Sequence, residues 1–128
     1  MNWTVEFHPE FESEFKKLTA GVQDELLATA KLLKAFGPQL GRPHVDTLKG
    51  SHYANMKELR FEAENGEWRT AFAFDLQRKA ILLVAGGKSG VSEKLFYRGL
   101  IAKADKRFTS HLEQQKAARK ASTTKKGK

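Results

Sequence analysis

Residues 55–88 decide the fold, and they read NMKELRFEAENGEWRTAFAFDLQRKAILLVAGGK. Three apolar-rich runs predict β-strands over 55–61, 68–75 and 80–85, because such runs bounded by turn residues are typical of strands. The turn at 64–67 contains Asn-Gly, a strong hairpin signal since this pair accepts positive φ at both central positions. The third run is apolar throughout, which indicates a central strand buried on both faces. The stretch therefore predicts a three-stranded antiparallel meander.

The residues before and after the meander predict one more strand and three helices. Trp3–Phe7 alternates apolar and polar residues as a strand does, and from Pro9 the apolar spacing changes to that of a helix ending near Leu18. A second helix follows from Val22 and ends at Gly37-Pro38, and a last one begins near Ser92. We therefore expect an α+β fold of order β-α-α-β-β-β-α. Its small antiparallel sheet, the N-terminal strand plus the meander, packs against an N-terminal helical hairpin and is followed by a C-terminal helix.

Composition limits the classes of protein that fit. The chain has 128 residues, 40% of them hydrophobic, and no cysteine, which excludes disulfides, thiolate nucleophiles and Cys-bound zinc. The longest apolar run, 80–85, is too short to span a membrane, and no basic segment with an apolar stretch opens the chain. We expect a cytoplasmic protein with one domain over residues 1–112.

The charge is uneven along the chain. The net charge is +8, and residues 103–128 hold nine Lys or Arg against two acidic residues, which leaves +1 for the rest. Residues 113–128 are therefore expected to form a basic, flexible tail, without a large hydrophobic residue from Gln114 onward. Such a tail either solubilises the protein or attaches it to nucleic acid without sequence specificity.

Cations gather on the first two strands of the meander. Lys57 and Arg60 lie on the first strand and Arg69 on the second, between apolar positions. Arginine binds phosphate oxygens through a planar fork that stays charged, so converging cations here favour an RNA or DNA phosphate as ligand. The alternative is cross-strand ion pairing with Glu58 and Glu62, and the sequence leaves both interpretations open.

Other chemical motifs are weak or absent. The glycine-rich turn 86–90 carries Lys88 after the last strand, but Leu82 stands where a Walker A motif needs its first glycine. The four histidines are scattered without metal-ligand spacing, so no metal site is expected. Among them His52 lies just before the cationic strand.

Several motifs together resemble a known family. They are Leu48-Lys49-Gly50, Met56-Lys57-Glu58-Leu59-Arg60, Trp68-Arg69, the aliphatic strand ending in Gly87-Lys88, and the closing helix. In this order they resemble the RelE/ParE superfamily of bacterial toxin–antitoxin toxins, and most of all its phage-derived HigB-like branch. The resemblance covers about residues 1–112 and leaves out the tail.

The resemblance implies a small bacterial endoribonuclease that cuts messenger RNA on the ribosome. In this reaction the ribose 2′-hydroxyl attacks the adjacent phosphate, so that neither a metal nor a cofactor is needed. It also implies a cognate antitoxin of helix-turn-helix, HigA-like type. Operator DNA would be bound only through that antitoxin, and no membrane is involved.

The resemblance also assigns roles to residues. Arg69 matches an arginine that stabilises the phosphate, Lys88 a basic position at the end of the last strand, and Tyr97 a tyrosine that activates the hydroxyl or stacks on a base. With Glu58, these are the expected catalytic residues. The expected RNA-binding residues are Lys57, Arg60, Lys49 and His52.

Two positions depart from the RelE pattern. Ser89 stands where that pattern has a second arginine, and Glu58 where it has a lysine. Glu58 can serve instead as a general base or orient Arg69. Because two central cations are missing, two other functions stay open: a ParE-like toxin that binds DNA gyrase without catalysis, and a non-toxic nucleic-acid-binding module.

Overall fold

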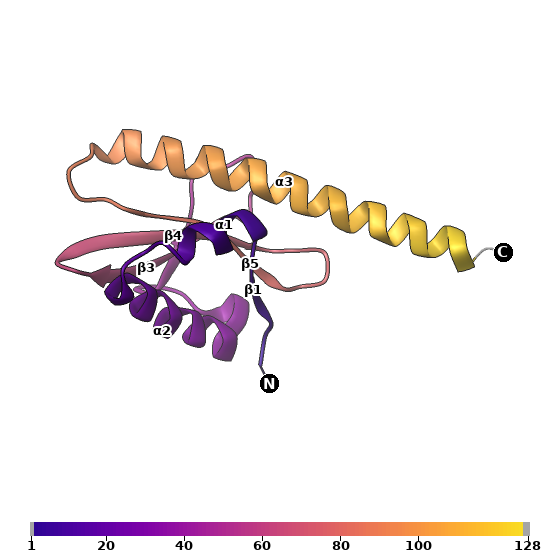
Figure 1. Cartoon of the computed structure of the whole chain (residues 1–128), viewed down its shortest axis with the longest axis horizontal. Helices are drawn as coiled ribbons and strands as arrows, with labels where there is room; N and C mark the ends of the chain where they lie inside the picture. The colour runs from indigo at the N-terminus through magenta and orange to yellow at the C-terminus, as the bar shows by residue number, and fades with distance from the viewer. Residues whose placement is uncertain (1, 127–128) are drawn as a thin grey trace.

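The structure is a computed structural model that describes the backbone of residues 2–126 and the side chains of residues 2–121. Its centre is a five-stranded mixed sheet in the order β1-β5-β4-β3-β2. Helices cover both faces, with α1 and α2 on one side and α3 on the other (Figure 1). The elements are β1 Val5–Phe7, α1 Pro9–Phe15, α2 Ala20–Phe36, the 3-10 turn η1 Gly37–Gln39, β2 Val45–Thr47, β3 Lys57–Ala63, β4 Gly66–Phe74, β5 Ala80–Gly87 and α3 Glu93–Lys126.

Alternation along the strands builds two separate cores. Leu59 and Phe61 on β3 point toward α1 and α2, where they pack with Leu26 and Leu33 of α2. Side chains on the other face of the sheet pack against α3, and the buried members of this second cluster are Leu48, Met56, Ala71, Ala73, Ile81, Leu83, Val84, Leu100, Ala104 and Phe108. Each face of the sheet is therefore covered by helix, which fixes the strands from both sides.

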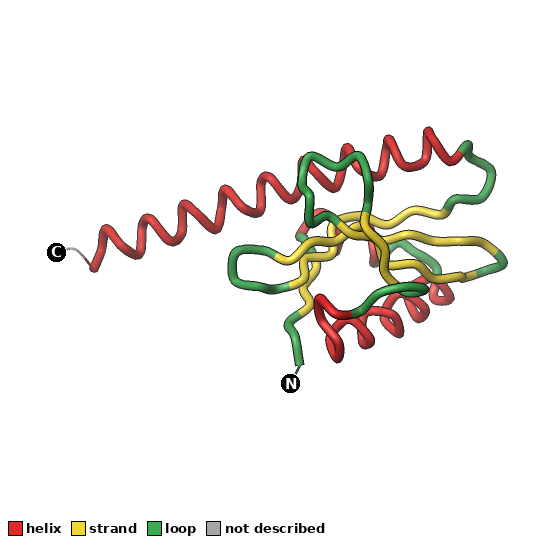
Figure 2. Tube along the Cα trace, turned by 180° about the vertical axis from the view of Figure 1, so that it is seen from behind, coloured by secondary structure: helices red, strands yellow, loops and turns green. Residues whose placement is uncertain are grey.

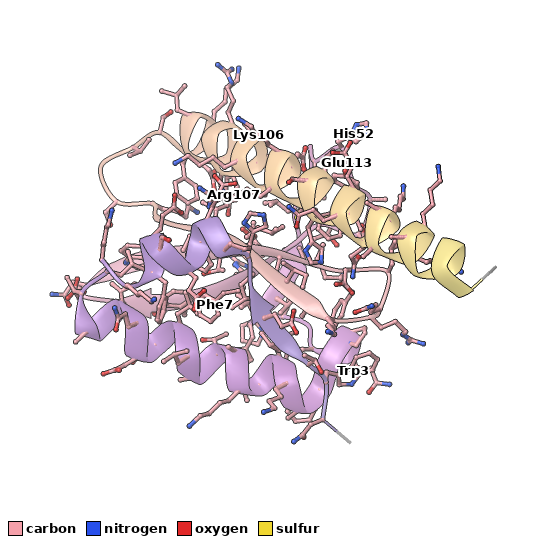
Figure 3. All side chains as sticks on the ribbon, turned by 45° about the vertical axis from the view of Figure 1, so that its right-hand side comes forward. Trp3, Phe7, His52, Lys106, Arg107 and Glu113 are labelled. Carbon is pink, nitrogen blue, oxygen red and sulfur yellow. The ribbon has the colours of Figure 1, made fainter. Side chains whose placement is uncertain are left out.

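A buried arginine joins the two helical layers. Arg107 of α3 donates hydrogen bonds of 2.9 and 2.6 Å to the Glu14 carboxylate of α1 and one of 2.7 Å to the carbonyl of Leu83. Its side chain passes from α3 toward α1 (Figure 3). These bonds hold α3 in place over β5, because a buried guanidinium needs all of its partners.

The α+β class and the order of the predicted elements are confirmed, but the sheet is not wholly antiparallel. β1 runs parallel to β5, with Val5 beside Ala80 and Phe7 beside Leu82. The prediction of an antiparallel N-terminal strand was therefore wrong. The sequence also gave no sign of β2, because three residues in a connector rich in Gly and Pro are too short to show alternation.

The hairpin between β3 and β4 turns one residue earlier than predicted. Glu64 and Asn65 carry positive φ angles of 52° and 63°, whereas Gly66 already pairs with Ala63 in the ladder. A Cβ at Gly66 would come within 2.8 Å of the Ser89 hydroxyl oxygen, so a larger residue there would require the Ser89 side chain to rotate. This register places Arg60 directly opposite Arg69.

Helix α3 is longer than the sequence predicts. The Ser92 hydroxyl accepts a hydrogen bond of 3.3 Å from the amide of Leu95, and the helix then continues to Lys126. The predicted tail, residues 113–128, is thus helical as far as residue 126, while its last two residues lie outside the described part. Its flexibility stays a prediction. No described helix is long and apolar enough to cross a membrane.

Candidate functional site

The candidate site lies where β3, β4 and β5 meet the first turns of α3. Arg69 on β4 has Arg60 of β3 on one side and Gly86 of β5 on the other. A Cβ at Gly86 would come within 3.0 Å of the Phe96 ring, so this face of the sheet looks toward α3. Glu58 and Arg60 share that face because they are two residues apart on one strand. The local fold therefore gathers charged side chains between the sheet and the helix.

Arg69 is the centre of the cluster, and it is only 2% exposed. Its Nε donates to the Tyr97 hydroxyl at 3.2 Å, one terminal nitrogen donates to Glu67 at 3.0 Å, and the other donates to the carbonyl of Trp68 at 2.9 Å. Burial acts to lower the pKa of Arg69, but the bonds to Tyr97 and Glu67 outweigh it and raise the pKa. The guanidinium thus has a fixed orientation and stays charged.

Glu58 is a buried carboxyl beside this guanidinium. It is 6% exposed, and its Oε1 lies 3.6 Å from Nε of Arg69 without a hydrogen-bond partner in the described part of the chain. Burial raises the pKa of Glu58 even though Tyr97, Arg69 and Arg60 act to lower it. A carboxyl with a raised pKa and an unused oxygen is a stronger proton acceptor than an ordinary carboxylate.

Tyr97 and Lys88 complete the cluster from the helix side. Lys88 follows β5, and its ammonium lies 5.4 Å from the centre of the Tyr97 ring and 3.1 Å from a carboxylate oxygen of Glu93. Burial, followed by the hydrogen bond with Glu58, raises the pKa of Tyr97. The hydroxyl of Tyr97 is therefore neutral and acts as a hydrogen-bonding group rather than as a charge.

The cluster borders a hollow of about 440 Å³. Arg60 and Arg69 line it together with Glu67. Its other wall comes from α2, the segment before β2 and the end of β3, with Glu25, Thr29, Pro43, His44, Phe61 and Glu62. The Arg60 side chain is 34% exposed, and that of Glu67 is 60% exposed. A ligand in this hollow would therefore meet Arg60 first and would reach Arg69 by displacing Glu67.

The structure brings together five of the eight predicted site residues: Glu58, Arg60, Arg69, Lys88 and Tyr97. The other three lie elsewhere. Lys57 is on the opposite face of the sheet, since it is one residue before Glu58 and opposite Phe72 of the α2-side core. Lys49 is exposed in the connector before β3.

His52 lies in the connector before β3 and contacts the middle of α3. There its backbone amide donates a hydrogen bond of 2.8 Å to the carboxylate of Asp105 (Figure 3). That contact is about 12 Å along the helix from Tyr97, at 1.5 Å per residue. The structure does not bring Lys57, Lys49 and His52 together with Arg60, and an RNA-binding role for these three residues stays a prediction. Strand alternation separates Lys57 from Arg60, and the docking of the connector on the middle of α3 separates His52 from it.

Ion pairing, the alternative interpretation of the cationic strands, is confirmed for Glu58, which lies 3.6 Å from Arg69 and 3.9 Å from Arg60. The sequence argument missed Glu67, the carboxylate that holds Arg69. Its position two residues before Arg69 was the available signal, because residues i and i+2 of a strand share a face.

Two further features frame the site. The described residues contain no group of three His, Cys, Asp or Glu side chains that could hold a metal ion. A second hollow of about 750 Å³ lies between the β4–β5 turn and α3, beside Asp75 and His111, which are joined at 2.8 Å. None of the predicted site residues lines it.

Similarity to solved structures defines the class of fold. The chain resembles a double arginine-to-alanine mutant of the E. coli toxin RelE in the free state, with a TM-score of 0.54, 13% identity and coverage of 80% of this chain and 97% of that one. It also resembles the archaeal RelE–RelB complex of Pyrococcus horikoshii OT3, with a TM-score of 0.50, 17% identity and coverage of 71% and 100%. The architecture is therefore that of RelE.

Curated relatives narrow the class. HigB3 of Mycobacterium tuberculosis (strain ATCC 25618 / H37Rv), named as a candidate toxin, is 38% identical over 107 residues, which cover 84% of this chain and 91% of HigB3. HigB2 of the same strain, named likewise, is 44% identical over 90 residues, covering 70% of this chain and 44% of HigB2, so the chain spans less than half of that relative. The class is the HigB-like branch of the RelE/ParE superfamily.

Within that class the family is defined by a direct match. Residues 13–109 match the phage-derived Gp49-like proteins (DUF891). The chain belongs to the Gp49-like family. The match ends at residue 109, so most of the projecting part of α3 lies beyond the shared family region.

Proposed function

We propose that the chain is the toxin of a type II toxin–antitoxin system that inhibits bacterial translation by cutting messenger RNA on the ribosome. The HigB relatives and the RelE-like architecture support the toxin class. The observation that carries the nuclease proposal is the convergence of Glu58, Arg69 and Tyr97 in one buried cluster beside an accessible hollow. A buried titratable group with a perturbed pKa beside a hollow is typical of a catalytic site.

The proposed reaction is an internal transesterification. The 2′-oxygen of the ribose forms a bond to the adjacent phosphorus, the bond from phosphorus to the 5′-oxygen breaks, and the products are a 2′,3′-cyclic phosphate and a 5′-hydroxyl. Glu58 takes the proton of the 2′-hydroxyl, and the ammonium of Lys88 gives a proton to the leaving 5′-oxygen. All reacting atoms come from the RNA and these two side chains, so protons and charges balance without a co-reactant.

Arg69 and Arg60 stabilise the phosphate in this proposal. Negative charge builds up on the non-bridging oxygens in the transition state, and cations of fixed orientation lower its free energy more than that of the ground state. The Tyr97 hydroxyl acts as a positioning group, because it accepts from Nε of Arg69 and so fixes the plane of a guanidinium whose terminal nitrogen bonded to Glu67 can be offered to the phosphate.

Glu67 occupies part of this fork in the protein without RNA. It holds a terminal nitrogen of Arg69 at 3.0 Å, and that bond is the first reason that the pKa of Glu67 is lowered. A phosphate entering the hollow competes with a carboxylate that is already largely exposed. The site therefore opens by rotation of one side chain, without a change of backbone.

The remaining parts of the proposal follow from the toxin class. A HigA-like antitoxin with a helix-turn-helix domain neutralises the protein, and operator DNA is bound through that antitoxin. The protein acts in the bacterial cytoplasm, where ribosomes and messenger RNA are available.

The test is expression of the chain alone compared with its Arg69→Ala variant. We expect the chain to arrest growth and to produce cuts inside translated messages, and we expect Arg69→Ala to abolish both. The matched control is Arg78→Ala, which removes an arginine that stacks on Trp3 outside the cluster. This variant should cleave messenger RNA as the unmodified chain does. Cleavage that persists in Arg69→Ala would contradict the mechanism, and gyrase-trapped DNA breaks with intact messages would favour the ParE-like alternative.

A further inference from the structure

The C-terminal part of α3 projects beyond the body of the protein (Figures 1 and 2). Leu112 still packs against the core, and Gln115 still donates to Asp75 at 2.8 Å. From Lys116 to Ala121 every side chain is exposed. We call residues 116–126 the α3 arm. It continues a helix whose earlier turns are anchored, so its direction is set by the body.

The composition of the arm indicates which kind of partner it can bind. Residues 116–128 contain six Lys or Arg and no Asp or Glu: Lys116, Arg119, Lys120, Lys125, Lys126 and Lys128. They contain no large hydrophobic residue either. A helix that docks in a groove of another protein presents an apolar stripe, and the arm has none. A polyanion is the partner that such a surface favours, because its binding releases counterions.

Two cations of the arm, Lys116 and Lys120, continue a line along the outer face of α3, whereas Arg119 lies at the hollow beside Asp75. Arg98, Lys106, Lys116 and Lys120 are all exposed and fall within an arc of about 80° at 3.6 residues per turn. They extend over roughly 33 Å of helix. Glu113 interrupts the line once, about two turns after Lys106 (Figure 3). This face is turned away from the sheet, and the body contacts it at Thr109, which bonds the hydroxyl of Tyr53 from the loop before β3. A long ligand that follows the face passes beside this loop.

We propose that the α3 arm and this outer face bind the phosphate backbone of double-stranded RNA, as a site separate from the cluster around Arg69. The choice of RNA over other polyanions rests on the proposed function. Lys116 lies 19 residues after Tyr97, roughly 28 Å along the helix, so the arm does not reach the reacting atoms. Its contribution is affinity without sequence preference, and that affinity falls steeply with salt.

The experiment measures binding of a fluorescent 20-base-pair RNA duplex to the full chain by anisotropy at several KCl concentrations. The arm variant combines Lys116→Gln, Arg119→Gln and Lys120→Gln. The control combines Lys16→Gln, Lys31→Gln and Lys34→Gln, which removes the same charge from exposed positions outside α3. We expect the arm variant to bind about 10-fold more weakly at 0.1 M KCl and to lower the slope of log K against log salt by about two. The control should change affinity less than threefold.

Three results would overturn the proposal. They are equal losses in the arm variant and the control, tighter binding of a DNA duplex of the same length and sequence, and equally tight binding of polyglutamate. Circular dichroism of both variants checks that α3 is intact. Duplex binding is measured without any cleavage step, so its result does not depend on whether the cluster around Arg69 is catalytic. Failure of the nuclease proposal and failure of the arm proposal are therefore distinguished.

Discussion

The two ends of α3 use positive charge in opposite ways. At the first turns, Tyr97 holds a guanidinium that is almost wholly buried and bonded through every nitrogen group. At the far end, Lys116, Arg119 and Lys120 are exposed on the part of α3 that projects from the body. Burying a charge costs free energy unless hydrogen bonds hold it, and a cation held in one orientation is suited to stabilise one transition state. An exposed charge is solvated and screened by salt, so it is suited to add affinity for a polyanion.

Removal of the carboxyl at the buried end should have the largest effect. Glu58→Gln keeps the shape of the side chain but loses the proton acceptor, so we expect cleavage to fall by about 10³-fold. Because the pKa of Glu58 is raised, the rate of the unmodified protein should rise with pH above the ordinary carboxyl range, and this limb should vanish in the variant. A single-turnover pH–rate profile measures both. An unchanged acidic limb in Glu58→Gln would assign the proton transfer to another group.

The same substitution affects stability in a direction that the pKa fixes. The folded protein holds the Glu58 proton more tightly than the unfolded chain does, so this residue makes the free energy of unfolding fall as pH rises through the raised pKa. The Glu58→Gln variant has no titrating group at this position, so its free energy of unfolding does not show this decrease. Urea unfolding of both proteins between about pH 4.5 and 8 should therefore favour the variant increasingly with pH.

A change of cation type should separate the two ends of α3 clearly. Arg69→Lys keeps the charge but loses the fork that bonds Glu67 and Trp68, and cleavage should fall by about 100-fold. Lys116→Arg on the arm should leave affinity for duplex RNA within twofold. Kinetics on the first variant and anisotropy on the second test this contrast. If Arg69→Lys cleaves normally, charge alone suffices at the buried end.

The hydroxyl of Tyr97 should matter less than the groups it orients. Tyr97→Phe removes one hydrogen bond to Arg69 while keeping the ring beneath Lys88, so we expect a loss of roughly 10-fold in kcat. Tyr53→Phe is the matched control, because its hydroxyl bonds Thr109 in the middle of α3. A positioning role predicts that the pH profile keeps its shape in Tyr97→Phe. A shifted profile would make the tyrosine a proton donor or acceptor.

The smallest expected effect is a gain. Glu67→Gln weakens the hold on Arg69 without removing a cation, so cleavage at low RNA concentration should rise about threefold. The measured quantity is kcat/KM, with the exposed Glu12→Gln of α1 as control. A loss of activity would mean that Glu67 orients Arg69 for the phosphate rather than occupying its place.

The sequence predicted the site in part, because strand alternation is local. The spacing of Glu58, Arg60 and Arg69 on two predicted strands indicated cations near one another, and the structure bears this out. It did not indicate the burial of Glu58, which depends on α3 covering that face. It also did not separate Lys57 from Arg60, because the face that each occupies follows from the β3–β4 register.

The parts of the fold that were not predicted depend on contacts between distant residues. Arg107 bonds Glu14 across 93 positions of sequence, and no local pattern marks such a pair. The parallel pairing of β1 with β5 likewise follows from the path of the chain through two helices. The length of α3 was missed because the residues after Gln114 lack an apolar stripe, and helix propensity without packing is a weak signal.

Because α3 is unbroken, it sets both the distance and the rotation angle between its two ends. Each added residue would advance the arm by about 1.5 Å and turn it by 100°, since an α-helix has 3.6 residues per turn. Inserting two residues after Gln115 would swing the lysines toward the flank of the β4–β5 turn while leaving composition almost unchanged. The direction in which the arm side chains point about the helix axis, relative to the first turns of α3, is thus a property separate from the charge of the arm.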